Sequence, residues 1–96
     1  MSCAWDELST NTPRDRQIAA RLIALSRDAF AEGEHILPVS LCQLTAFFLS
    51  HPDLTLPRIT LTPNGTLRVR WMRGAGFFVA IEFTGRRRVQ LVAEIP

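Results

Sequence analysis

Residues 57–95 alternate between apolar and polar side chains in short runs that are separated by turn residues. A period of two is typical of β-strands that bury one face. Because the runs follow one another closely, we predict a continuous antiparallel β-meander of four strands. Successive side chains of a strand point to opposite faces of its sheet. The alternation therefore predicts which side chains lie in the core and which can meet a partner.

The predicted turns set the register of the strands. Residues 62–65, Thr-Pro-Asn-Gly, fit a type I turn with glycine in the left-handed bulge position. Residues 73–77 predict a second hairpin of the same kind, and residues 84–86 predict a three-residue turn. The pairs that follow are Leu61 with Leu67, Ile59 with Val69, Trp71 with Val79, Val69 with Ile81, Ile81 with Val89, and Val79 with Leu91.

This register divides the side chains between two faces. The core face is predicted to hold Ile59, Leu61, Leu67, Val69, Trp71, Val79, Ile81, Phe83, Val89 and Leu91. The open face is predicted to hold Arg58, Thr60, Arg68, Arg70, Met72, Phe78, Ala80, Glu82, Arg88, Gln90, Val92 and Glu94.

The open face has a charged end and an apolar end. Glu82 is predicted to lie between Arg68 and Arg88, a surface charge ladder in which each pair contributes at most about 0.2–1 kcal/mol. The apolar row is predicted to contain Met72, Phe78 and Val92. Apolar side chains beside arginines are typical of an interface. The predicted partner-binding residues are therefore Arg68, Arg70, Met72, Phe78, Arg88 and Val92.

Residues 1–52 carry helical patterns. Residues 12–15, Thr-Pro-Arg-Asp, predict a helix start, and Gly33 predicts the end of that helix. Its apolar stripe is predicted to contain Ile18, Leu22, Leu25 and Ala29, widened by Ile23 and Phe30. Its solvent side is predicted to carry Arg14, Arg21, Arg27 and Asp28. A second helix is predicted from about residue 38 to His51, because Pro52 disfavours a helical conformation before it. Residues 2–8 predict a short helical turn.

These elements predict an α+β fold, with two helices packed on one face of the four-stranded meander. The 96 residues are enough for a single domain with one modest core, divided into a helical part (1–52) and the meander (57–95).

Composition limits the possible partners and location. All eleven basic residues are arginine, and tyrosine is absent, as a GC-rich genome favours. The net charge of +2 predicts only weak overall attraction to nucleic acid. The apolar runs are too short for a membrane span, and the acidic N-terminus is unlike a signal peptide. We therefore expect a cytoplasmic protein that does not enter the membrane, with Cys3 and Cys42 reduced.

No pattern in the sequence predicts catalysis. Residues 74–76, Gly-Ala-Gly, join two strands and open no helix, which excludes a dinucleotide fingerprint, and a phosphate loop would need a lysine. The cysteines and histidines lack metal-ligand spacing, and no serine occupies a nucleophile elbow. We therefore expect a protein that is not an enzyme and that binds no metal or cofactor.

The arginines at positions 86–88 leave two interpretations open. Arg86, Arg87 and Arg88 can anchor an anion, either a phosphate of nucleic acid or an acidic protein partner. They can also be solvated turn charges that prevent aggregation at a strand edge. The second interpretation is favoured, because arginine alternates out of the core as any surface residue does.

The motif P-x-I-x-x-T-P-x-G-x-x-x-x-x-W, from Pro57 to Trp71, resembles a hairpin pattern of small, uncharacterised bacterial and mobile-element α+β proteins. Those proteins also place a helix that ends in a His-Pro-like break just before the hairpin, as His51 and Pro52 do here. The resemblance implies a helix-plus-meander fold and no activity.

The leading hypothesis is a small protein–protein interaction module that uses the open sheet face. An inhibitor, adaptor or immunity-type protein encoded by a phage or mobile element fits this description, for example an anti-CRISPR or an antitoxin, although no residue selects one of these roles. The alternative is a nucleic-acid-binding protein that uses its arginines. Homodimerisation through the same face, or through the edge strand over residues 57–62, is a further possibility.

Overall fold

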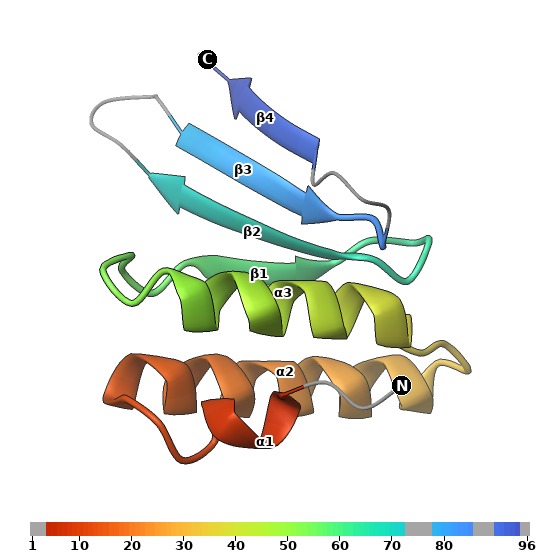
Figure 1. Cartoon of the computed structure of the whole chain (residues 1–96). Helices are drawn as coiled ribbons and strands as arrows, with labels where there is room; N and C mark the ends of the chain where they lie inside the picture. Colours follow the sequence, from red (N-terminus) through yellow and green to blue (C-terminus); the bar gives the residue numbers. More distant parts are fainter. Residues whose placement is uncertain (1–3, 73–77, 86–89, 95–96) are drawn as a thin grey trace.

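A computed structural model of the chain describes residues 4–72, 78–85 and 90–94, with the backbone alone for Phe78 and residues 90–94. Its helices are α1 (Trp5–Leu8), α2 (Pro13–Ala31) and α3 (Pro38–Ser50). Its strands are β1 (Arg58–Leu61), β2 (Leu67–Met72), β3 (Phe78–Phe83) and β4 (Gln90–Glu94). The strands lie in the order β1-β2-β3-β4 and neighbours are antiparallel (Figure 1). The predicted α+β class with an antiparallel sheet is confirmed. The described residues form the two predicted longer helices and a third, α1, which lies within the short helical turn predicted for residues 2–8.

Helix α2 begins as predicted. The Thr12 hydroxyl accepts a hydrogen bond from the Asp15 N–H (3.1 Å), and Pro13 opens the helix. One side of the helix is buried at a spacing of three and four residues, namely Asp15, Ile18, Leu22, Leu25 and Ala29. Ile23 and Phe30 do not widen this side as predicted, because they are 42% and 82% exposed. Each lies one residue beyond the buried stripe, about 100° further around the helix.

The register of the first three strands agrees with the prediction. Leu61 pairs with Leu67, Ile59 with Val69, Trp71 with Val79, and Val69 with Ile81. The prediction for β4 is wrong by two residues. Ile81 pairs with Leu91 rather than with Val89, and Val79 pairs with Ala93 rather than with Leu91. A shift of two residues leaves the assignment of residues to the two faces unchanged, because the period of a strand is two.

The end of β3 is bonded to α3. Gly85 has a φ of 83°, and its N–H donates to Gln43 Oε1 of α3 (3.0 Å). The end of β3 is thus tied to the helix, and β4 enters the sheet two residues later than a tight hairpin would place it.

The core lies between the helices and one face of the sheet. Helix α3 packs on β2 and β3, α2 packs against β1, and α1 contacts both other helices. The most deeply buried apolar residues of the core are Leu8, Ile18, Leu22, Leu44, Phe48, Ile59, Leu67, Val69 and Phe83. Trp71 is buried as predicted, and its indole N–H donates to the Thr55 carbonyl (2.9 Å). Ala80, an open-face position, is also buried.

Ser40 joins α3 to the sheet. Its hydroxyl donates to the Phe83 carbonyl (2.6 Å) and accepts from the Leu67 N–H (2.8 Å), so it contacts β3 and β2 at once. The side chain is fully buried. A buried hydroxyl with both partners satisfied fixes the position of α3 along the strands.

Arg14 was predicted on the solvent side, and this prediction is wrong. Its guanidinium donates to the carbonyls of Phe48 (2.8 Å), His51 (2.7 Å) and Leu54 (2.7 Å), which lie at and beyond the end of α3. It also forms a salt bridge with the buried Asp15 carboxylate (2.7 Å). Arginine can satisfy several helix-end carbonyls at once because its donors form a planar fork.

Cys42 also differs from the expectation. Its side chain is half-buried and disulfide-bonded rather than reduced. Cys3 lies outside the described residues. Among the described helices, none is long and apolar enough to cross a membrane.

Candidate functional site

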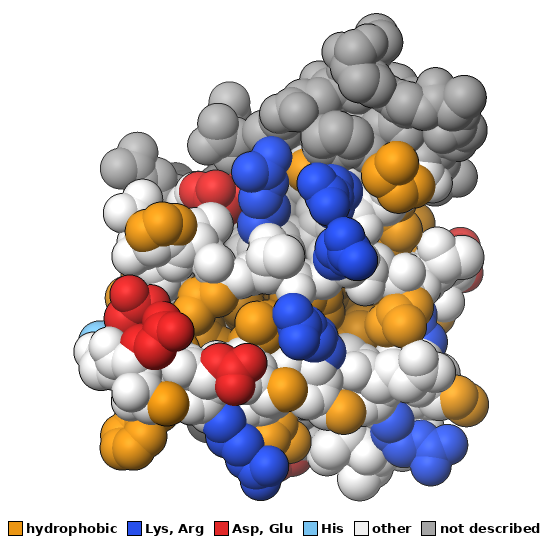
Figure 2. Space-filling model, turned by 180° about the vertical axis from the view of Figure 1, so that it is seen from behind, with side chains coloured by type: hydrophobic (Ala, Val, Ile, Leu, Met, Phe, Trp, Pro, Cys, Tyr) orange, Lys and Arg blue, Asp and Glu red, His pale blue; other side chains and the backbone are white. Residues whose placement is uncertain are grey.

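Three arginines and a threonine gather on the open face of strands β1 and β2. In the register of these strands Arg58 lies opposite Arg70, and Thr60 lies opposite Arg68. These four residues line a hollow of about 90 Å³. Figure 2 shows arginine side chains close together on this side of the molecule, above a band of hydrophobic side chains.

The local sequence explains this arrangement. Ile59 and Val69 lie between the polar residues along β1 and β2, and both are buried in the core. Because side chains alternate along a strand, burial of Ile59 directs Arg58 and Thr60 to the open face, and burial of Val69 does the same for Arg68 and Arg70. Pairing of the two strands then brings the four side chains into one block.

The block brings like charges together. Like charges directly opposite each other on neighbouring strands are destabilising, and Arg58 faces Arg70 in this way. Their row continues through Ala80 to Val92 and contains no acidic residue. In the neighbouring row Arg68 lies opposite Glu82. Among the side chains that the structure describes on this face, one carboxylate lies beside three guanidinium groups.

The three arginines differ in exposure. Arg58 is exposed, whereas Arg68 and Arg70 are half-buried. Arg68 and Arg70 each also make an interaction within the chain, which limits the freedom of their side chains. Held side chains lose less conformational entropy when they bind a ligand than free ones do.

The structure brings some of the predicted partner-binding residues together. Arg68 and Arg70 line the same hollow, and Met72 lies opposite Phe78 at the end of β2, where the Met72 side chain is 65% exposed. Val92 does not share their row, because it pairs with Ala80, and Glu94 pairs with Phe78 instead. The predicted apolar row is therefore wrong at Val92.

The predicted charge ladder is half right. Glu82 lies opposite Arg68 as predicted, but its other neighbour is Gln90 rather than Arg88. Arg86, Arg87 and Arg88, the predicted anion anchor, lie outside the described residues.

Sequence reasoning placed Arg58 and Thr60 on the open face but did not assign them to the site. The signal was present in the turn at residues 62–65, because the register that it sets pairs Arg58 with Arg70. A cross-strand pair of like charges is the feature that distinguishes this block from an ordinary solvated strand.

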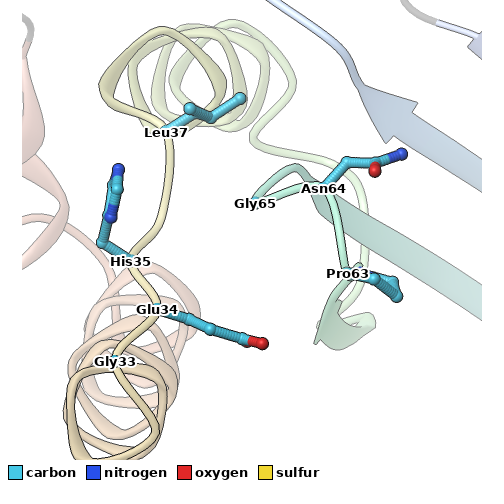
Figure 3. A pocket seen from close by; sticks show the side chains of 7 residues that line it. All are labelled: Gly33, Glu34, His35, Leu37, Pro63, Asn64 and Gly65. Carbon is cyan, nitrogen blue, oxygen red and sulfur yellow. The ribbon is translucent and has the colours of Figure 1, made fainter.

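A second hollow lies between the loop that follows α2 and the turn that follows β1. It measures about 220 Å³ and is lined by Gly33, Glu34, His35, Leu37, Pro63, Asn64 and Gly65. The Leu37 N–H donates to the Gly65 carbonyl (2.9 Å), which holds the loop against the turn. Figure 3 shows Glu34 directed toward the turn and the His35 ring directed away from it, so these two groups do not converge.

The outer edge of β1 is covered by α2. Arg21 Nε donates to the Ile59 carbonyl (3.3 Å), and Ile59 is only 1% exposed, backbone included. Hollows of about 580 and 290 Å³ that both include Arg21 flank this contact. Covering an edge with a helix prevents pairing with another strand. One carbonyl of the edge strand, that of Ile59, is therefore already bonded within the chain.

Neither a metal site nor a similar protein indicates a function for the described residues. Within the described residues, no group of three or more histidine, cysteine or acidic side chains could hold a metal ion. No protein-family model matches the chain, and neither does any curated protein or solved structure. Function must therefore be inferred from the site itself.

Proposed function

We propose that this protein is a non-enzymatic protein-interaction module that binds an acidic region of a protein partner through the open face of its sheet. The observation that supports it most is the block of Arg58, Arg68 and Arg70 around one hollow. Arginine is enriched in interfaces because its planar fork binds carboxylates through two hydrogen bonds. A small inhibitor, adaptor or immunity-type protein would act through such a surface.

The apolar end of the face favours a protein over nucleic acid. Met72 is exposed next to the arginine block and lies opposite Phe78. An exposed apolar residue beside arginines suits the mixed surface of a protein partner. The net charge of +2 gives little long-range attraction to a polyanion.

Nucleic-acid binding is the second candidate function, because arginine clusters also bind backbone phosphates. Two properties separate the two functions. Nucleic-acid affinity falls steeply with salt concentration, whereas an interface with an apolar part depends less on salt. Nuclease treatment also removes a nucleic-acid bridge but leaves a protein contact intact.

The experiment is a pull-down of the tagged full chain from a host lysate that is divided into nuclease-treated and untreated halves, with mass spectrometry of both. We expect a protein partner that survives nuclease treatment and is lost with Arg70→Glu and with Met72→Asp. Ile23→Asp is the matched control, because Ile23 is also exposed but lies on α2, and it should leave recovery unchanged. The proposal would be contradicted if nuclease treatment abolished recovery of the partner, or if Met72→Asp left its recovery unchanged.

A further inference from the structure

We propose that the hollow between Arg58, Thr60, Arg68 and Arg70 is a binding site for one phosphomonoester group, carried by a phosphorylated segment of the protein partner. This inference rests on the proposed function, because it names the chemical group that the open face recognises. The four residues that line the hollow supply only polar donors from their side-chain ends, three guanidinium groups and one hydroxyl.

The donors match the acceptors of a phosphomonoester. Such a group has three terminal oxygens, each a strong hydrogen-bond acceptor. Three guanidinium groups can each bind one or two of these oxygens, and the Thr60 hydroxyl can donate a further bond. A carboxylate has only two oxygens and can bridge fewer of these groups.

The charge of the block also favours a dianion. The hollow gathers three guanidinium groups, and Glu82 lies opposite Arg68. A phosphomonoester carries about −1.5 to −2 at neutral pH, so it attracts the three guanidinium groups more strongly than a singly charged carboxylate does. The repulsion between the paired Arg58 and Arg70 would then become a joint attraction for the bound group.

The shape of the site favours one group over a nucleic-acid strand. The hollow holds about 90 Å³, and its arginines occupy facing positions on only two strands. Double-stranded DNA presents single charges at intervals along its length, and each phosphodiester carries only one. A track of basic residues would suit that ligand, whereas the described part of the open face concentrates its arginines around a single point.

The first test titrates the full chain with inorganic phosphate and follows the arginine side-chain Nε–Hε signals by NMR, with chloride added to equal ionic strength as the reference. We expect saturable shifts at Arg58, Arg68 and Arg70, whereas Arg27, an exposed arginine of α2, stays in place. The proposed site would be wrong if all arginine signals shifted equally, or if phosphate caused no shift larger than that caused by chloride.

The second test compares three probes by calorimetry: an acidic phosphoserine peptide, the same peptide unphosphorylated, and a single-stranded oligonucleotide of equal charge. We expect the phosphopeptide to bind at least about tenfold more tightly than either of the others, because hydrogen bonds to charged groups are strong. Oligonucleotide binding that equals or exceeds phosphopeptide binding would overturn the proposal in favour of nucleic acid.

Substitutions of the lining residues test whether the phosphopeptide binds in the hollow. Arg58→Gln and Arg70→Gln should each weaken phosphopeptide binding about tenfold, and Thr60→Val, which keeps the shape but removes the hydroxyl, should weaken it severalfold. Arg27→Gln should have no effect. A melting curve for each variant checks that it is folded, and folded Arg58→Gln and Arg70→Gln chains with unchanged affinity would overturn the assignment.

Phosphatase treatment separates this inference from the proposed function. If the partner in the pull-down is lost after the lysate is treated with phosphatase, the phosphate site is supported. If the partner stays bound through Arg70 and Met72 after phosphatase, the phosphomonoester proposal is wrong while the protein-interaction function stands. If recovery depends on nucleic acid, the proposed function itself fails.

Discussion

Arg14 connects the start of α2 to the end of α3 through three backbone carbonyls and the Asp15 carboxylate. We predict that Arg14→Gln lowers the free energy of unfolding by about 2–4 kcal/mol, because it leaves Asp15 and several carbonyls without charged donors. Urea denaturation monitored by tryptophan fluorescence measures this change. Arg27→Gln, at an exposed position of the same helix, should stay within about 0.5 kcal/mol of the unchanged chain. Equal losses in the two variants would contradict the bridging role.

Ser40 gives a second prediction at the scale of one residue. Ser40→Ala removes the bond to Phe83 and leaves the Leu67 N–H without its acceptor inside the core. We expect a loss of about 1–3 kcal/mol of stability, the usual cost of an unsatisfied buried group. Ser26→Ala, an exposed position on α2, is the control for serine removal. Amide hydrogen exchange at Leu67 should accelerate in Ser40→Ala, and unchanged exchange there would contradict the prediction.

The roles of Arg14 and Ser40 could not be predicted from the sequence, and the reason is the same for both. Arg14 is adjacent to Asp15, and Ser40 lies in the first turn of a helix, so their local patterns fit ordinary surface and capping positions. Their partners lie more than 25 positions away along the chain. Helical periodicity reports the direction of a side chain but not which distant carbonyl meets it.

The connection after β3 supplies a prediction at the scale of an element. Gly85 has a φ of 83°, and an added Cβ would lie 2.5 Å from Val39 Cγ2 of α3. We predict that Gly85→Ala costs more than the roughly 1–2 kcal/mol that a left-handed conformation costs an alanine, because the clash adds to the strain. Thermal unfolding measures the difference.

Gly33 provides the matched control for Gly85. Its φ of 77° is similar, but an added Cβ there would have no atom within 4 Å. Gly33→Ala should therefore show the conformational cost alone, about 1–2 kcal/mol. Val39→Ala combined with Gly85→Ala should recover part of the excess loss. Equal destabilisation by the two glycine substitutions would show that α3 does not constrain the end of β3.

The elements themselves were predictable to different degrees. The cap of α2 and the turn at residues 62–65 depend on residues adjacent in sequence, and the structure has both where the sequence predicts them. The position of β4 differs by two residues from the prediction, and no local pattern encodes the contact of Gly85 with Gln43 of α3.

Trp71 carries a prediction for the whole molecule. Its ring packs near Phe48 of α3, and its N–H binds the Thr55 carbonyl in the connector before β1. It therefore links a helix, the connector and the sheet. We predict that Trp71→Ala costs about 3–5 kcal/mol, a large part of the stability of a domain of this size. Melting followed by circular dichroism tests this prediction, and we expect the variant to lose its cooperative transition. A well-folded variant with an unchanged melting temperature would contradict the prediction.

At the scale of the whole molecule, the candidate site was half predictable. Alternation placed Arg68 and Arg70 on the open face together with Arg58 and Thr60, and it did so without knowledge of the helices. The hollow that these four residues line depends on the pairing of β1 with β2, and the closed edge beside it depends on Arg21 of α2. Both features therefore depend on contacts between elements rather than on one strand.

The sequence by itself determined the start of α2, the first hairpin and the two faces of the sheet, because caps, turns and alternation act between residues a few positions apart. The tertiary structure decided the burial of Arg14 and Ser40, the register of β4, the cover over the β1 edge and the convergence of three arginines with Thr60. These features depend on contacts between elements that only packing brings together. Such contacts form where they satisfy buried polar groups and fill the core, and that condition belongs to the whole fold rather than to any segment.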